Sequence, residues 1–507
     1  MKVLLVNPSS PRNVPKSTRA ELRYDPPLAA LYLSSFLKMK GIASDIVDTA
    51  LDDVDYDRVR RGEYGLVSFT VFIGEFQKKA REIALKIREA NPDVPIVYGG
   101  VMVSIFPEEF LRTYPVDYIV RYEGENTLYE LVLALDGKMK IDHVRGLSHK
   151  SHSAVVHNPP RHLQDDLDAF PAPMWDLLGK YSNIRQLPYY FSIMTSKGCP
   201  FKCTFCYNRQ VEDTILADSP VWRYRSAEHV IHEINAIHNL TGTRVFTFGD
   251  DNFLVNRERA IRILEYFRHN NLYIEQCIGH MNNFNSPELI GAMSGVVQTG
   301  IYALESASPR LLSLLKKSLK VENVPDINRR LFEHGITTIH NFIVGLPTET
   351  EEELAMNIAL MRRLKEINPF VRGNPYLYMP LPDTPLESYI RDTMGFAMPH
   401  DLLHYENARF DFEGGQKYRP WIDEERYYLL KDYCDIFRDV FQINNLEVSD
   451  DTLKKLDANP KLKRMFGDVT TISRPPQKYI PYVLDRVLRG EKIDLATDLV
   501  RMARKAE

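Results

Sequence analysis

The segment SKGCPFKCTFCYNR, residues 196–209, contains three of the five cysteines of this 507-residue chain. Cys199, Cys203 and Cys206 have the spacing C-x3-C-x2-C and follow YFSIMTS (190–196), an apolar run that predicts a β-strand. A loop at a strand end can turn three thiolates toward one point, as an iron–sulfur cluster requires. The spacing is not that of common zinc pairs, and no fourth Cys or His stands at zinc-ribbon distance. The segment predicts a four-iron cluster with one iron open to a further ligand. Buried cysteines or an unrelated zinc site are the alternatives.

The region around this segment predicts a barrel. From residue 190 to about residue 380, strand-like runs alternate with helical patterns. Six β/α repeats are too few for a closed eight-stranded barrel, so we expect an open, partial (β/α)6 barrel of the TIM type. The expected strands are 190–196, 244–250, 272–281, 297–306, 337–346 and 370–380, and the expected helices are 226–239, 255–269, 287–294, 308–316, 323–334 and 350–367.

The first 140 residues also alternate, and their strands are almost continuously apolar. This pattern is typical of an α/β, doubly wound, Rossmann-like parallel sheet, whose ligands lie at the carboxyl ends of its strands. The first strand is followed by NPSSPRN rather than G-x-G-x-x-G, which argues against a nicotinamide dinucleotide site. The expected strands are 2–7, 43–48, 65–70, 95–100 and 117–120, and the expected helices are 27–40, 75–90 and 125–135.

The remaining segments show less pattern. The stretch before the barrel is rich in proline and acidic residues and has no sustained period, which predicts a linker. The end of the chain is predicted to be mostly helical and contains no motif. We therefore expect a first domain at 1–144, a linker at 145–188, a barrel at 189–389 and a helical substrate or capping domain at 390–507.

Composition limits the class of protein. A net charge of −4 argues against nucleic acid as a partner, and 44% hydrophobic with 26% charged residues is ordinary for a globular protein. No uncharged run reaches the ~18–20 residues that span a bilayer, and the start MKVLLVNPSS lacks the features of a signal peptide. Five cysteines do not form a disulfide framework, so we expect a reducing, cytoplasmic location.

The cysteine segment resembles the signature of the radical S-adenosylmethionine (SAM) superfamily, including an aromatic residue, Phe205, before the third cysteine. The resemblance covers about 190–390 and implies that the open iron binds SAM, which is cleaved to methionine and a 5′-deoxyadenosyl radical. It also implies SAM contacts at the later strand ends. At PYLYMPLPDTPL, Asp383 replaces the glycine of the family's Pro-x-Pro-Gly-Thr segment. The implied SAM-binding residues are Phe205, Gly249, Asp250, Asp251, Glu305, Ser306, Gly345 and Pro347.

The first domain resembles the domain that precedes the barrel in cobalamin-dependent radical SAM enzymes, through PPLAALYLSSFLKMKG, YGGVMVSIFPEEFL, VDYIV and YEGENTLYELV. No D-x-H-x-x-G occurs, and Met102 stands where the family often has the histidine of Gly-Gly-x-His. The resemblance therefore implies cobalamin without a histidine ligand from this domain. A domain of this fold that has lost its cofactor is the alternative. The implied cobalamin residues are Ser68, Thr70, Gly99, Gly100, Val101, Met102, Ser104, Glu123 and Gly124.

The two remaining cysteines narrow the possible classes of radical SAM enzyme. Cys277 lies in a predicted strand and Cys434 in an aromatic helical stretch, so both are expected to be buried and inert. They are too few for a second iron–sulfur cluster. The first domain has no cysteine, whereas methylthiotransferases carry a second triad there.

These features and resemblances predict a cobalamin-dependent radical SAM methyltransferase that methylates an unactivated carbon, or phosphorus, of a small molecule through methylcobalamin. An electron donor of the flavodoxin or ferredoxin type is the expected partner. The alternatives are a ring contraction, cyclisation or rearrangement with the same cofactors, and a non-catalytic cobalamin-binding protein. Candidate catalytic or substrate residues are His280, Asn282, Asn283, Tyr376 and Tyr378, which lie at strands of the expected barrel.

Overall fold

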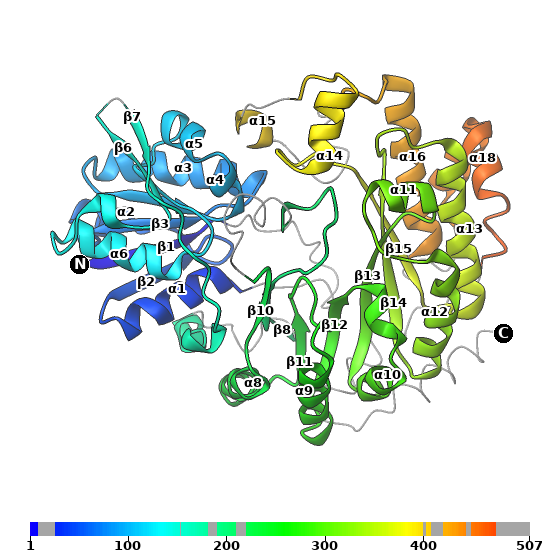
Figure 1. The fold of residues 1–507 in the computed structure, drawn as a ribbon, viewed down its shortest axis with the longest axis horizontal. Helices are drawn as coiled ribbons and strands as arrows, with labels where there is room; N and C mark the ends of the chain where they lie inside the picture. Colours follow the sequence, from blue (N-terminus) through cyan, green and yellow to red (C-terminus); the bar gives the residue numbers. More distant parts are fainter. Residues whose placement is uncertain are drawn as a thin grey trace.

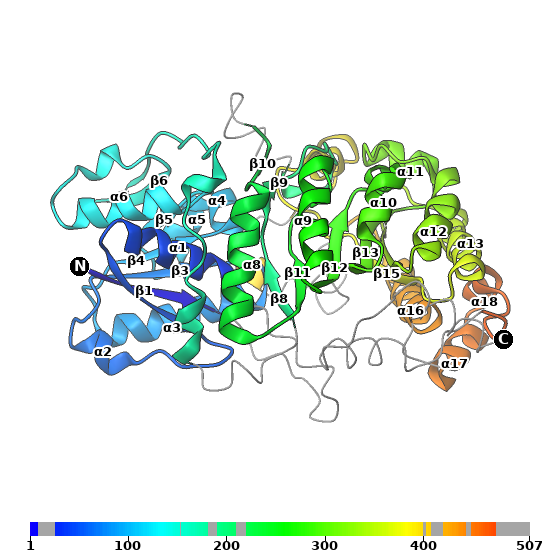
Figure 2. The same cartoon turned by 90° about the horizontal axis from the view of Figure 1, so that it is seen from below.

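A computed structural model describes residues 1–8, 26–152, 154–180, 190–208, 220–398, 402–406, 419–442 and 448–472. These residues form two large sheets, each with its own helices, that lie side by side, and a third sheet of two short strands (Figures 1 and 2). No helix in the described part of the chain is long and apolar enough to cross a membrane.

The first sheet has seven strands in the order β2-β1-β3-β4-β5-β6-β7, and the first five are parallel. Neighbouring residues of β1 enter different cores, because side chains alternate along a strand. Val3 and Leu5 pack with α1 and α6, whereas Leu4 and Val6 pack with α3 and α5. Helices thus cover both faces, and the doubly wound fold is confirmed. The elements are β1 (Lys2–Asn7), α1 (Leu28–Met39), β2 (Ala43–Asp48), α2 (Tyr56–Arg60), β3 (Leu66–Thr70), α3 (Glu75–Ala90), β4 (Ile96–Gly99), α4 (Val101–Ile105), α5 (Pro107–Thr113), β5 (Tyr118–Val120), α6 (Glu125–Leu135), β6 (Leu147–Ser151) and β7 (Ala154–His157).

The stretch 145–188, expected as a linker, differs from expectation at its start. β6 pairs antiparallel with β5, and β7 pairs antiparallel with β6, so both strands extend the first sheet. β6 and β7 are the last two strands at one end of the sheet, with β7 at its edge, and their short, mixed sequences lack the apolar run of the central strands. Short 3-10 turns follow at η3 (Leu167–Ala169) and η4 (Trp175–Lys180), after η2 (Ile141–His143) between α6 and β6.

The second sheet has six parallel strands in the order β15-β14-β13-β12-β11-β8, and its first and last strands do not pair with each other. The open, partial barrel is therefore confirmed. Side-chain caps start several of its helices, including Ser226 for α8, Asn256 for α9 and a Thr350–Glu353 capping box for α13. The elements are β8 (Tyr190–Ile193), α8 (Ala227–Thr241), β11 (Val245–Phe248), α9 (Arg257–His269), β12 (Tyr273–Gly279), η5 (Met281–Asn285), α10 (Pro287–Met293), β13 (Val297–Glu305), α11 (Pro309–Leu314), η6 (Val321–Asn323), α12 (Val324–Glu333), β14 (Thr337–Val344), α13 (Glu351–Ile367) and β15 (Arg372–Leu377).

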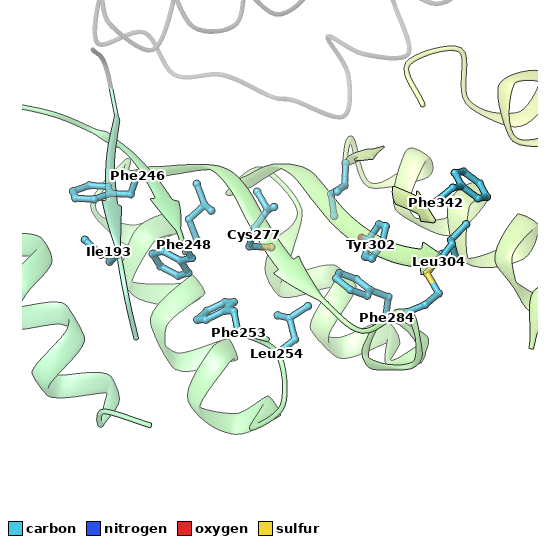
Figure 3. Packing of buried hydrophobic residues seen from close by; sticks show 14 of the residues in the cluster. Ile193, Phe246, Phe248, Phe253, Leu254, Cys277, Phe284, Tyr302, Leu304 and Phe342 are labelled. Atoms are coloured by element: carbon cyan, nitrogen blue, oxygen red, sulfur yellow. The ribbon is translucent and has the colours of Figure 1, made fainter. Parts of the chain in front are cut away.

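The outer side of the barrel strands forms a continuous apolar core. Figure 3 shows Cys277 of β12 within this core, among Phe248, Tyr302 and Phe284. Cys277 is fully buried, and burial raises its pKa to about 12. Cys434 is also fully buried. Both are therefore inert thiols, as the sequence predicts.

The region after the barrel is helical where it is described, and one of its helices contacts the first sheet's helices. In α15, the Glu406 carboxylate accepts two hydrogen bonds from the Arg81 guanidinium at 2.6 and 2.8 Å and one from the Tyr114 hydroxyl at 2.6 Å. Tyr405 packs on Phe106. In Figure 1, α15 accordingly lies beside the first unit. The elements are α14 (Pro385–Ser388), the π-helical turn η7 (Tyr389–Thr393), α15 (Leu402–Glu406), α16 (Glu424–Phe441), α17 (Asp450–Ala458) and α18 (Pro460–Phe466).

Candidate functional site

The residues from Cys199 to Cys206, called here the cysteine loop, directly follow β9 (Ser196–Gly198), which pairs antiparallel with β10 (Trp222–Tyr224). Gly198 has a φ of 79°, and a Cβ atom there would lie 1.9 Å from the Val221 carbonyl oxygen. Only glycine fits this entry to the loop. In the middle of the loop, the Thr204 N–H donates to the Leu315 carbonyl at 3.0 Å, and the Thr204 carbonyl accepts from Leu386 N–H at 2.9 Å. The loop is thus fixed to elements far along the chain.

The three cysteines of the loop are free thiols that influence one another electrostatically. Burial raises the pKa of each, that of Cys206 to about 12. No three Cys, His, Asp or Glu side chains of the described residues lie at the spacing of a single-ion site. A four-iron cluster spreads its thiolates over different irons, and its positive charge would favour the thiolate forms. The donor set therefore fits such a cluster.

Asp250 and Asp251 follow β11 but have different surroundings. The Asp250 carboxylate accepts hydrogen bonds from the backbone N–H and hydroxyl groups of Thr195 and Ser196, and the side chain is completely buried. Asp250 therefore fixes Thr195 and Ser196 at the start of β9. Asp251 lines a cavity and accepts a hydrogen bond from the Asn208 amide at 3.0 Å. Its negative charge contributes to the raised pKa of Cys199 and of Cys206. Of these two aspartates, only Asp251 has its carboxylate at the cavity.

A buried ion pair lies beside the cysteine loop. Glu305 ends β13 with a φ of 68°, and its carboxylate is 3.1 Å from the Lys317 ammonium group. Burial alone would lower the pKa of Lys317, but Glu305 and Cys203 raise it. Ser306 is buried, and its hydroxyl accepts from Ser308 N–H at 3.1 Å. The sequence analysis missed Lys317, whose only signal was a pair of lysines at the end of an apolar helix.

The turn after β14 has the shape that its glycine predicts. Gly345 has a φ of 73°, and its N–H donates to the Glu349 carboxylate at 2.6 Å, while its carbonyl accepts from the Trp421 indole at 3.0 Å. Pro347 is buried. Burial raises the pKa of Glu349 to about 8. In the later turn, Asp383 has a φ of 56°, so an aspartate adopts the left-handed conformation that glycine usually takes.

The catalytic candidates of the sixth strand are not brought together. β15 ends at Leu377, so the alternation that would point Tyr376 and Tyr378 the same way does not continue. Tyr376 is 40% exposed, whereas Tyr378 is 3% exposed and packs in a small core with Leu346 and Leu386. The candidate roles of both tyrosines stay predictions. Asn282 donates to the Ser318 carbonyl at 2.6 Å, and Asn283 to the Leu254 carbonyl at 3.3 Å.

A cavity of about 500 Å³ lies between the two units. On the first-unit side, it meets the carboxyl ends of β3 and β4 and the loop after β5. Gly100 is required at this place, because its φ is 118° and a Cβ atom would lie 2.4 Å from the Val71 carbonyl oxygen. Met102 does not line the cavity but is buried in the core of the first unit, and its expected contact with the cofactor stays a prediction. The other expected residues do line it: Ser68, Thr70, Gly99, Gly100, Val101, Ser104, Glu123 and Gly124.

The barrel side of the same cavity reaches the cysteine loop. Gly198, Tyr207 and Asn208 line it next to the cysteines. Phe205 instead packs against the small core of Leu311 and Leu386. The flat, glycine-lined wall of the first unit and the approach to the thiols together fit a large planar cofactor beside a cluster. Sequence reasoning missed the barrel-side lining, because it depends on how the two units pack.

Ion pairs join the two walls of the cavity. The Glu125 carboxylate is 2.8 Å from the Lys197 ammonium group, and the Glu123 carboxylate accepts from the Arg223 guanidinium at 2.7 Å. Burial alone would raise the pKa of Glu123, but Lys197 and Arg223 lower it. Because Lys197 is two residues before Cys199, these pairs connect the loop after β5 to the cysteine loop.

Comparisons with known proteins agree with this geometry. The radical SAM superfamily model matches residues 193–361, and the B12 binding domain model matches residues 19–132. An uncharacterised methyltransferase of Pyrococcus horikoshii is 30% identical over 383 residues, which are 74% of this chain and 81% of that protein. The anaerobic magnesium-protoporphyrin IX monomethyl ester cyclase of Rubrivivax gelatinosus is 27% identical over 415 residues, 77% of this chain and 70% of the cyclase.

Among solved structures, the cobalamin-dependent S-adenosylmethionine radical enzyme OxsB, with aqua-cobalamin and S-adenosylmethionine bound, has the same fold with a TM-score of 0.68. It is 17% identical, and the match covers 100% of this chain and 79% of OxsB. The chain belongs to the radical SAM superfamily and carries a B12 binding domain ahead of the radical SAM domain. It is an enzyme whose cofactors are a [4Fe–4S] cluster, SAM and cobalamin.

Proposed function

We propose that this enzyme transfers a methyl group from cobalamin to an unactivated carbon, or less readily phosphorus, of a small molecule after radical hydrogen abstraction. The observation that carries the proposal is the single cavity, which extends from Gly100 of the first unit to Gly198 and Tyr207 beside the cysteine loop. A substrate in this cavity would contact both cofactors. The methyltransferase of Pyrococcus horikoshii, which matches over most of both chains, supports the methyl transfer.

The proposed residue roles follow from burial and contacts. Cys199, Cys203 and Cys206 hold the cluster. Asp251 binds the amino group of SAM, since Asp250 is fully engaged with the chain around Thr195. Lys317, held by Glu305, offers a cation to the SAM carboxylate. Ser306 contacts SAM near its ribose and carboxylate groups, and the Gly345–Pro347 turn contacts its adenine ring. When bound, the cluster and SAM supply a carbon radical and cobalamin supplies the methyl group.

The proposed reaction balances. One C–H bond of the substrate breaks, and its hydrogen goes to the deoxyadenosyl group. One C–C bond forms with the transferred methyl group. Two SAM molecules and two electrons give the methylated substrate, S-adenosylhomocysteine, methionine and 5′-deoxyadenosine. The electrons come from an external donor of the flavodoxin or ferredoxin type, because the described residues hold only one cysteine triad of the cluster kind.

A radical cyclisation or rearrangement is the second candidate. The match to the ester cyclase of Rubrivivax gelatinosus over 77% of this chain favours it. The same residues would bind the same cofactors, and no methyl group would leave SAM.

Several expectations from the sequence stay predictions. They are the domain ranges 1–144, 145–188, 189–389 and 390–507, the role of the last range in substrate choice, the absence of nucleic acid partners and the cytoplasmic location.

The test uses the full chain, reconstituted anaerobically with iron, sulfide and hydroxocobalamin and then given SAM and a strong reductant. We expect a corrinoid spectrum, 5′-deoxyadenosine and S-adenosylhomocysteine, with the last two in equal amounts once substrate is present. Bound corrinoid with deoxyadenosine alone would move the conclusion to cyclisation or rearrangement. A chain with no bound corrinoid would contradict the cofactor roles given to the first unit.

A further inference from the structure

His280 follows β12 and lies flat against the cysteine loop. Its imidazole ring stacks on the ring of Phe201, with centroids 3.9 Å apart and an interplanar angle of 16°. Phe201 lies two residues after Cys199 and two before Cys203. His280 is only 6% exposed. A neighbouring strand of the barrel therefore places an aromatic nitrogen heterocycle beside the middle of the cysteine loop.

The hydrogen bonds of His280 define its tautomer. Its Nδ1 atom accepts a hydrogen bond from Asn282 N–H at 3.3 Å, so the proton of the neutral ring is on Nε2. Burial, together with the charge of Lys317, lowers the pKa of His280 to about 3, and the ring is neutral at physiological pH. Thus Nε2 is a hydrogen-bond donor.

This donor has no protein partner. The Nε2 atom is buried and makes no hydrogen bond to any described residue. A buried N–H without an acceptor destabilises a fold, and most such groups in native proteins find a partner in protein, water or a bound group. The unpaired N–H therefore indicates an acceptor that arrives with the cofactors.

We propose that the Nε2–H group of His280 donates a hydrogen bond to a sulfur atom of the [4Fe–4S] cluster in the cysteine loop, making His280 a positioning residue that raises the cluster's reduction potential. Reduction adds negative charge to the cluster, so a donor to its sulfur favours the reduced state. The inference rests on the cysteine assignment of the proposed function, but not on methyl transfer.

The test compares two substitutions in the full chain after cluster reconstitution. His280→Phe keeps a ring to stack on Phe201 and removes the N–H group. His280→Gln removes the ring and keeps an N–H group at a similar reach. His269→Phe is the control, because His269 is exposed at the end of α9. The measurement is the reduction potential of the cluster, followed by EPR in a redox titration without SAM.

We expect His280→Phe to lower the potential, so that the ratio of reduced to oxidised cluster at a fixed potential falls about fivefold. His280→Gln should keep most of the wild-type value, and His269→Phe all of it. An unchanged potential in His280→Phe overturns the proposal. It is equally overturned if His280→Phe weakens SAM binding without moving the potential, since the acceptor would then be SAM.

A second measurement does not depend on how the variants fold. Wild-type protein labelled with ¹⁵N-histidine should show a nitrogen hyperfine coupling and an exchangeable proton at the reduced cluster. Absence of both, with the cluster signal present, contradicts the hydrogen bond alone. Absence of the [4Fe–4S] signal itself would contradict the cysteine assignment, so the two failures are distinguishable.

Discussion

At the scale of single residues, neighbours in sequence do different work. Asp250 faces inward and Asp251 faces the cavity, although both follow the same strand. The sequence predicts an acidic turn at this strand end, but it cannot divide the roles, because the division depends on Thr195 and Ser196, more than fifty residues earlier. Lys317 was missed because only the fold shows that the turn after α11 brings it against Glu305 at the end of β13.

Asp251→Asn should weaken SAM binding about tenfold, because it removes a charged hydrogen-bond acceptor that faces the cavity. It should change thermal stability little. Asp250→Asn is the matched change. It should lower the melting temperature and the iron content, because Asp250 holds the chain before the cysteine loop. Equilibrium dialysis and differential scanning fluorimetry measure the two effects. Equal effects of the two substitutions on SAM binding would contradict the division of roles.

Glu349 gives a pH dependence with a defined sign. Burial raises its pKa from 4.5 to about 8, so the folded protein holds this proton more tightly than the unfolded chain does. Its contribution to stability is therefore present below about pH 4.5 and is lost as the pH rises to about 8.

We expect Glu349→Gln to gain stability relative to wild type between pH 5 and pH 8, by at most ~1.4 kcal/mol per pH unit. Melting temperatures of both proteins across this range measure the gain. Parallel curves would show that Glu349 is already ionised at low pH. Glu366→Gln, at an exposed position of the same helix, is the control.

At the scale of elements, apolar runs decided what the sequence could predict. Strands such as β1, β3, β11 and β14 are largely buried on both faces, so each is a recognisable apolar run. The strands β6 and β7, at one end of the first sheet, carry polar residues such as His149 and Lys150 and were expected to be part of a linker. Met102 was assigned to the cofactor by its place in a motif, but the helical phase of α4 turns it into the core.

The turn from β4 to α4 depends on Gly100. Gly100→Ala should destabilise the first unit by roughly 1–3 kcal/mol and reduce cobalamin binding, because its Cβ atom would clash with the Val71 carbonyl. Gly137→Ala is a clean control, since Gly137 also has a positive φ of 72° but open space around it. It should cost no more than ~1 kcal/mol. Urea denaturation and hydroxocobalamin titration give both values, and equal losses would rule out the clash.

At the scale of the whole molecule, the cavity depends on the contact between the units. Glu125 is almost buried and Lys197 about one-third exposed in the pair that joins them. Neither sequence pattern nor motif predicts this contact, because Glu125 begins α6 of the first unit whereas Lys197 lies in β9, more than seventy residues later.

Glu125→Gln and Lys197→Met should each weaken hydroxocobalamin binding, and the double variant should lose less than the sum. We expect a coupling of roughly 0.5–3 kcal/mol in a double-mutant cycle of stability. The exposed pair Arg112–Glu108 on α5 is the comparison and should couple more weakly, because solvent screens it. Strictly additive effects at Glu125 and Lys197 would mean that the pair does not join the units.

The attachment of α15 to the first unit has a further consequence. Arg81 and Glu406 are 325 positions apart, so the chain passes through the whole barrel and then returns to its starting unit. The pair of Glu125 with Lys197 and the pair of Arg81 with Glu406 are thus two attachments between the first unit and the rest of the chain. A hinge motion that separates the units would have to break at least one of them. The return of the chain to its starting unit therefore restrains any opening of the cavity between the units.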